Sequence, residues 1–116
     1  MSDAIKIINE NKIIVIVRGV AKDKLIPLVT AMYDGGIRVV ECTYDASGKI
    51  ADEDIAANIK MLADHFGDKM AIGAGTVLTE KQVELTKNAG GTFIISPDTN
   101  ADVIRRTKEL GLVSIP

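Results

Sequence analysis

The run Ile13-Ile14-Val15-Ile16-Val17 decides the fold class of this chain. Every residue in it is apolar and β-branched. A continuous run of this kind predicts a strand buried on both faces, as the strands of a parallel sheet are. Arg18-Gly19 ends the run, so the first strand is expected to end there.

A helix is predicted directly after this strand. Apolar residues recur at the spacing of one helix face, and they are Leu25, Leu28, Val29 and Met32. Pro27 fits if it lies in the first turn, where few backbone hydrogen bonds are lost. Gly35-Gly36 is a typical end for such a helix.

The same alternation of strand and helix continues to residue 116. Further strands are predicted over 38–43, 70–77, 92–95 and 112–115, and a short N-terminal helix around 3–9. Three helix starts have capping signals, namely Asp52, Thr79 in the capping box Thr79-Glu80-Lys81-Gln82, and Asn100. The chain is therefore expected to form one α/β unit over 1–116, with about four βα units and a fifth strand.

Two architectures fit this pattern. One is a closed, five-stranded, flavodoxin-like binding or assembly module with strand order 2-1-3-4-5. The other is the first half of an eight-stranded (β/α) barrel with sequential strand order. In both, ligands bind at the carboxyl ends of the strands.

Composition excludes several classes of protein. The chain has 116 residues, 47% hydrophobic and 26% charged, with a net charge of -2. These values indicate a globular protein without the basic excess that nucleic-acid binding requires. No apolar stretch approaches a membrane span or a signal peptide. The single cysteine, Cys42, excludes an internal disulfide and a multi-cysteine metal site, which is typical of a reduced, cytoplasmic compartment. No metal cluster is visible in the sequence, and no cofactor is expected.

Glu41 is the candidate catalytic residue. Strand alternation places Val39, Glu41 and Thr43 on one face, which would be the lumen of a barrel, and Val40 and Cys42 on the other. A carboxyl group there would be desolvated and its pKa raised, which suits a general acid or base. A structural ion pair between Glu41 and Arg18 is the alternative.

Other candidates lie at neighbouring strand ends. Arg18 could hold a substrate carboxylate, and the hydroxyl of Thr76 could contact a ligand. Gly73-Ala74-Gly75-Thr76 lacks the third glycine of a dinucleotide fingerprint, so its glycines could instead allow close packing. Cys42 is expected to be a buried apolar residue, and His65 to be exposed on a helix.

Several segments, in order, resemble the N-terminal half of the class I aldolases that cleave 2-keto-3-deoxy-6-phosphogluconate and 4-hydroxy-2-oxoglutarate. The resemblance covers nearly the whole chain. The matching segments are Ile16-Val17-Arg18, residues 35–43 (Gly-Gly-Ile-Arg-Val-Val-Glu-Cys-Thr), residues 72–77 (Ile-Gly-Ala-Gly-Thr-Val), Ala89-Gly90, residues 93–97 (Phe-Ile-Ile-Ser-Pro) and Ile115-Pro116.

The resemblance implies a (β/α)8 barrel, usually a homotrimer, that reversibly releases pyruvate and an aldehyde. A lysine would form a Schiff base with the keto group of the substrate. Glu41 would move protons. The substrate-binding residues would be Arg18, Thr43, Thr76 and Pro97.

Two departures from the family pattern stand out. Asp45 occupies the position where many members have an arginine that grips the pyruvate carboxylate, so Arg18 and Thr76 would have to bind that group, or the substrate differs. The Schiff-base lysine of the family lies on strand six, beyond Pro116. We therefore expect a half-barrel, inactive alone, that is truncated, proteolysed or incompletely recorded, or that self-associates.

Overall fold

A computed structural model describes residues 3–116 of the chain. Helices and strands alternate throughout in the order α1 (Ala4–Asn11), β1 (Val15–Val17), α2 (Lys22–Asp34), β2 (Val39–Thr43), α3 (Asp52–Phe66), a 3-10 turn (Gly67–Lys69), β3 (Ala71–Gly75), α4 (Glu80–Asn88), β4 (Phe93–Ile95), α5 (Ala101–Glu109) and β5 (Val113–Ile115). Each predicted strand and helix is present, with ends that differ by a few residues. Among residues 3–116, no helix is long and apolar enough to span a membrane.

The strands form one parallel sheet in the order β1-β2-β3-β4-β5. Glu41 of β2 lies in register with Ile16 of β1 and with Gly73 of β3. The next inward-facing pair along these strands is Thr43 with Gly75. This sequential order is the one predicted for a half-barrel, and it excludes the flavodoxin-like order 2-1-3-4-5.

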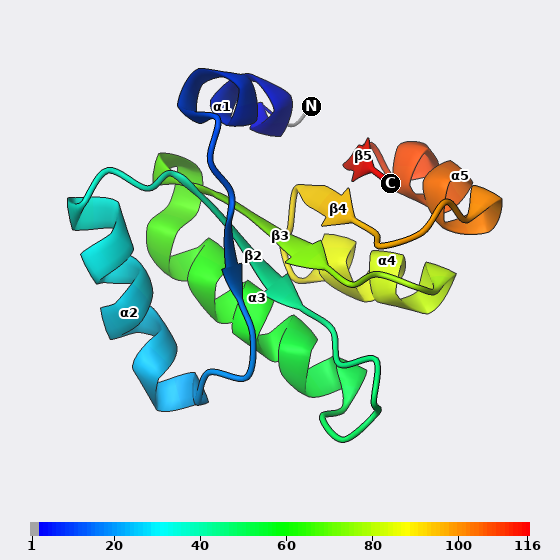
Figure 1. Cartoon of the computed structure of the whole chain (residues 1–116), viewed down its shortest axis with the longest axis horizontal. Helices are drawn as coiled ribbons and strands as arrows, with labels where there is room; N and C mark the ends of the chain where they lie inside the picture. The colour runs from blue at the N-terminus through cyan, green and yellow to red at the C-terminus, as the bar shows by residue number, and fades with distance from the viewer. Residues whose placement is uncertain (1–2) are drawn as a thin grey trace.

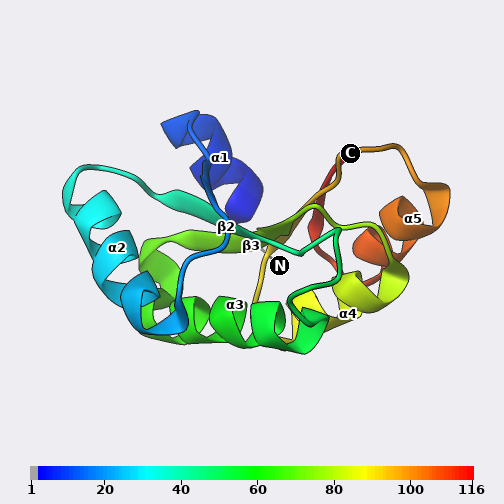
Figure 2. The ribbon, with the colours of Figure 1, turned by 60° about the horizontal axis from the view of Figure 1, so that its bottom comes forward.

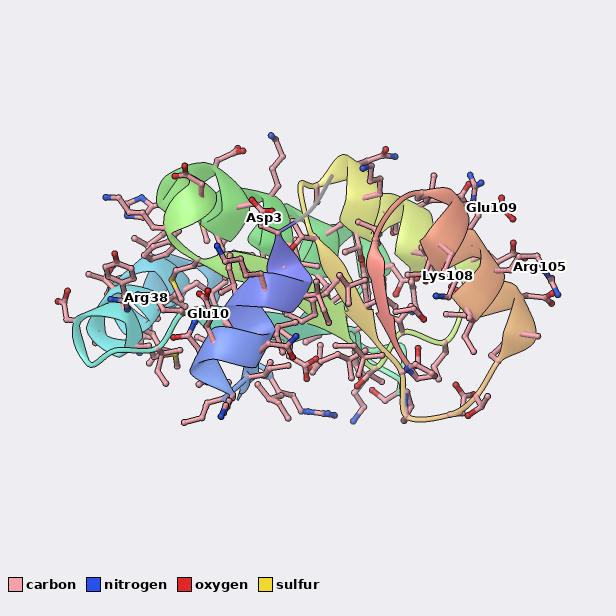
Figure 3. The ribbon with its side chains drawn as sticks, turned by 90° about the horizontal axis from the view of Figure 1, so that it is seen from above. Asp3, Glu10, Arg38, Arg105, Lys108 and Glu109 are labelled. Carbon is pink, nitrogen blue, oxygen red and sulfur yellow. The ribbon has the colours of Figure 1, made fainter. Side chains whose placement is uncertain are left out.

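Helices cover the two faces of the sheet unequally. Helices α2 to α5 lie along its outer face, whereas α1 lies on the inner face (Figures 1 and 2). Seen from above, α1 crosses the sheet with Asp3 and Glu10 toward its two ends (Figure 3). Ala4 of α1 packs with Val39, Ala71 and Phe93 near the amino ends of their strands. The opposite, carboxyl ends are therefore left open for a ligand.

Helix capping follows the predictions at two of three sites. The Thr79 hydroxyl accepts a hydrogen bond from the Gln82 amide at 3.2 Å, and Asn100 caps α5. The prediction for Asp52 is wrong, because Ala51 is the N-cap and Asp52 is the first residue of α3. The Asp52 carboxylate instead accepts a hydrogen bond from Gln82 Nε2 at 3.1 Å, which joins α3 to α4.

Helix α2 departs from its prediction in two ways. It begins at Lys22, so Pro27 lies beyond the first turn rather than within it. Because proline has no backbone N–H, a hydrogen bond of the helix is lost there. Leu28 is exposed, and only Leu25 and Val29 of the predicted face are fully buried.

The prediction that the first strand is buried on both faces is wrong. Val17 packs against the helices and is buried, but Ile16 on the inner face is 60% exposed. The strand is shorter than the apolar run, and Ile13 before it is 58% exposed. The reason is that β1 is an edge strand, with a neighbour on one side only and no layer over its inner face at Ile16.

Candidate active site

The site is built around Glu41 on the inner face of β2. Glu41 is 4% exposed, and its Oε2 atom is buried without a hydrogen-bond partner. Burial raises the pKa of this carboxyl group, an effect that the positive charge of Arg18 partly opposes. The sequence prediction of a desolvated carboxyl with a raised pKa is confirmed. A buried polar atom without a partner costs free energy, so it indicates a group kept for a purpose other than stability.

Arg18 and Thr76 meet beside this carboxyl. Arg18 Nη2 donates to Thr76 Oγ1 at 3.5 Å, a long hydrogen bond that leaves both groups able to bind a ligand. Ion pairs within 4.0 Å among residues 3–116 do not include Arg18 and Glu41. The alternative of a direct structural ion pair between them is therefore wrong, although the charge of Arg18 still acts on Glu41.

The backbone of Thr76 explains how its side chain reaches Arg18. Its φ is 53°, a left-handed conformation that is costly for a β-branched residue. β3 ends at Gly75, before the predicted end at residue 77, so a face assignment from strand period does not apply to Thr76. Such strained residues gather at functional sites.

Thr43 and Pro97 lie on the same edge but differ in their surroundings. Thr43 is buried, and its hydroxyl donates to the Val17 carbonyl at 3.5 Å. Pro97 is exposed and follows β4, two residues beyond Ile95. The structure thus brings Arg18, Glu41, Thr43 and Thr76 together over β1 to β3 and leaves Pro97 farther along the edge.

A small hollow opens between the ends of β1 and β2. It has a volume of about 150 Å³. The residues that line it are Arg18, Gly19, Thr43, Tyr44, Asp45, Ile50 and Ile55. A larger hollow of about 290 Å³ lies beside α1 and the 3-10 turn, where it is lined by Ala4, Gly67 and Met70 among others. The smaller hollow adjoins the carboxyl ends of β1 and β2, where ligands bind in such sheets, and it shares Arg18 and Thr43 with the site, whereas Glu41 and Thr76 do not line it.

Asp45 organises the loop that follows β2. Its Oδ1 accepts hydrogen bonds from the backbone and the hydroxyl of Ser47, at 2.9 and 2.6 Å, and its Oδ2 accepts one from the Ile50 amide at 2.9 Å. The Ser47 hydroxyl and these backbone amides lower the pKa of the Asp45 carboxyl. The carboxylate is engaged with its own loop, so it holds loop 45–50 in place.

Tyr44 is a structural residue beside the site that the sequence alone did not identify. It is 0% exposed, and its hydroxyl lies 2.9 Å from Thr86 Oγ1 and donates to the Gln82 carbonyl at 3.3 Å. Burial raises the pKa of Tyr44 to about 12. Tyr44 therefore ties the end of β2 to α4, beside the site. The sequence signal that could have identified Tyr44 is its residue type: it is an aromatic residue directly after a strand, in a chain with only two Tyr and two Phe.

Replacing Tyr44 with phenylalanine should destabilise the chain by about 1 kcal/mol, because the hydrogen bonds of the hydroxyl are lost. The cost stays small because Thr86 Oγ1 still donates to the Gln82 carbonyl at 2.8 Å. Urea unfolding measures the change. Tyr33→Phe is the matched control, since Tyr33 is only half-buried and its ring stacks on Arg38 with or without the hydroxyl. A loss no larger than that of the control would contradict the structural role of the Tyr44 hydroxyl.

Cys42 and His65 lie where the sequence places them. Cys42 is buried among the helix-facing side chains, and burial raises the pKa of its thiol to about 12. His65 is exposed on α3 and contacts the edge of the Phe66 ring. Within residues 3–116, no three His, Cys, Asp or Glu side chains gather as metal ligands would.

Residues 4–116 match the family model described as "KDPG and KHG aldolase". The chain belongs to this aldolase family. The resemblance seen in the sequence is thereby confirmed. The sequential parallel sheet is then half of a barrel of the TIM type, as predicted.

Curated relatives and a solved structure agree with this family. The chain is 33% identical to 2-dehydro-3-deoxy-6-phosphogalactonate aldolase of Escherichia coli (strain K12), over 90% of this chain and 48% of that protein. It is 37% identical to 2-dehydro-3-deoxy-phosphogluconate aldolase of Treponema pallidum, over 78% and 40%. KDPG aldolase of Legionella pneumophila, solved with pyruvate as a covalent carbinolamine, is 26% identical with a TM-score of 0.80, over 95% and 50%. The chain thus spans about half the length of these aldolases.

Proposed function

We propose that residues 1–116 are one α/β unit, the N-terminal half-barrel of a class I aldolase. The reaction is the reversible cleavage of 2-keto-3-deoxy-6-phosphogluconate or 4-hydroxy-2-oxoglutarate, or of a close relative, to pyruvate and an aldehyde. The observation that carries the proposal is the buried Glu41 carboxyl, with its unpartnered oxygen, beside Arg18 and Thr76. A proton-transfer group needs this kind of desolvated position.

The chemistry divides between this half and a lysine that it does not supply. In a Schiff-base aldolase, the lysine amine condenses with the keto carbon and releases water. A base then takes the proton of the C4 hydroxyl, the C3–C4 bond breaks, and the aldehyde leaves. The remaining enamine takes a proton at C3 and is hydrolysed to pyruvate and free lysine. Glu41 carries these protons, because its raised pKa lets it both accept and return one.

Arg18 and Thr76 bind the carboxylate of the pyruvate moiety in this proposal. Asp45 repels an anion and is already bound to Ser47 and Ile50, so it does not replace the arginine that many family members have at this position. Arg18 is exposed and free of ion pairs among residues 3–116, and the Thr76 hydroxyl is within its reach. Thr43 is the neighbouring substrate-binding residue in this proposal, and Pro97, farther along the same edge, would contact the substrate only at its far end.

The 116-residue chain alone should not form a Schiff base. Each of its lysines is exposed, whereas a lysine nucleophile at neutral pH needs a pKa lowered by burial or by neighbouring charge. Treating the chain with pyruvate and borohydride, followed by intact mass spectrometry, should give no adduct. Fusing the C-terminal half of the Escherichia coli relative after Pro116 should restore an adduct, located in the added half. An adduct on the 116-residue chain would contradict the proposal and identify the nucleophile.

The open inner face supports a further proposal about partners. Ile16 on that face is exposed, and β1 is an edge of the sheet that can pair. We propose that this face is covered by another half-barrel, either the C-terminal half of the same protein or a second copy, within a homo-oligomeric enzyme. Light scattering after gel filtration distinguishes a self-associating chain from a monomer.

We also propose a cytoplasmic location, since the free thiol of Cys42 suits a reducing compartment.

A further inference from the structure

Two glycines of β3 face inward and hold different side chains. A Cβ atom built on Gly73 would lie 2.6 Å from three carbon atoms of the Phe93 ring. A Cβ atom built on Gly75 would overlap both oxygens of the Glu41 carboxyl group. Neither glycine has a positive φ, so their backbones would accept alanine. What excludes a side chain is the neighbour that rests on each Cα.

The contact between Glu41 and Gly75 runs diagonally across the two strands. Glu41 lies in register with Gly73, but its carboxyl group lies over Gly75, the residue in register with Thr43. The side chain of Glu41 therefore leans along the strands toward their carboxyl ends, the edge at which Arg18 and Thr76 meet. The direct position over Gly73 is already filled by Phe93, which is 0% exposed.

We propose that Gly75 is a positioning residue for Glu41: its bare Cα leaves the space in which the carboxyl group lies against β3, with its Oε2 atom buried and unpartnered. The inference rests on the proposed function for the role of Glu41, but its readout needs no aldolase activity. A methyl group at position 75 would push the carboxyl group off β3. The carboxyl group would then lie farther from the sheet, over the inner face, where solvent reaches the neighbouring Ile16.

Few charged groups act on the carboxyl group of Glu41. Among the described residues, Arg18 at the end of β1 is the charge that lowers its pKa. The positions beside it on β3 are glycines, and Ile16 is its partner on β1. Cys42, its neighbour along β2, is buried among the helix-facing side chains. A change in the pKa of Glu41 therefore indicates that its carboxyl group has moved.

The test is a titration of the Glu41 side chain by carboxyl carbon-13 NMR in the 116-residue chain. Glu41→Gln identifies its signal by removing it. In the unaltered chain, Glu41 should titrate above the exposed glutamates. In Gly75→Ala, its pKa should fall toward theirs, on the order of a tenfold rise in the acid dissociation constant. An unchanged pKa in folded Gly75→Ala, or an ordinary pKa in the unaltered chain, would overturn the proposal.

Gly73→Ala is the matched control, because it adds the same methyl group two residues earlier on the same face. It meets the Phe93 ring rather than Glu41, so it should lower the melting temperature and leave the pKa of Glu41 raised. If circular dichroism shows that Gly75→Ala does not fold, the proposal is tested by the folding of the double variant Glu41→Ala with Gly75→Ala, measured in the same way. A folded double variant supports the proposal, since it removes the group that the methyl meets. An unfolded one overturns it.

Discussion

Replacing Glu41 with glutamine should stabilise the chain at neutral pH and remove most of the activity of a completed barrel. Glutamine has the same shape but no charge, so no carboxylate has to be buried without a partner. We expect a gain of about 1 kcal/mol or more in the free energy of unfolding. Removing the proton-transfer group should lower turnover by roughly 10²–10⁴-fold. Urea unfolding and pyruvate release measure the two effects.

The raised pKa of Glu41 also predicts how the stability of the chain changes with pH. Burial raises the pKa of Glu41 in the folded chain above that of the unfolded chain. Between these two values the folded chain holds a proton that the unfolded chain has lost, so stability falls as pH rises through that window. Glu41→Gln should lose this contribution, match the unaltered chain at low pH, and exceed it above the folded pKa. The same pH profile for both proteins would contradict the burial of Glu41.

The activity measurement has its own control. In the barrel fused to the C-terminal half of the Escherichia coli relative, Glu41→Gln should still be trapped by pyruvate and borohydride, because the lysine is intact. A loss of turnover with retained trapping assigns proton transfer to Glu41. Full turnover in this variant would remove Glu41 from the mechanism, and equal loss of trapping and turnover would indicate a collapsed site.

Replacing Phe93 with alanine should cost about 3–5 kcal/mol of stability, the usual range for a buried aromatic side chain. Phe93 is 0% exposed, rests on Gly73, and packs with Ala4, Val39 and Ala71. The cluster holds α1 against the inner face of the sheet, so α1 should detach early. Guanidinium unfolding gives the free energy, and hydrogen exchange of the α1 amides should speed up before global unfolding.

Ile13→Ala tests whether burial, rather than size, sets that cost. Ile13 is large and apolar but 58% exposed, so its loss should change stability by no more than about 0.5 kcal/mol. If both variants cost the same, the inner cluster around Phe93 does not support the fold as the structure indicates.

Local signals in the sequence were sufficient for most of the secondary structure. Apolar runs and helical spacing act over a few residues, and so they located every strand and helix. The capping side chains of Thr79 and Asn100 act within one turn and were found correctly. Asp52 has the same local signal, but its carboxylate serves Gln82 on α4 instead. That choice depends on packing between helices, which no local pattern reports.

By itself, the sequence determined the alternating α/β architecture, the family resemblance, and the placement of Glu41 on the inner face with a raised pKa. Only the tertiary structure decided that Arg18 reaches Thr76 rather than pairing with Glu41, that Ile16 lies on an open edge, and that the Glu41 carboxyl rests on Gly75. The physical reason is the distance along the chain over which each interaction acts. Strand period follows from neighbouring residues, whereas these contacts join strands far apart in sequence, and their geometry depends on register and on the left-handed backbone of Thr76.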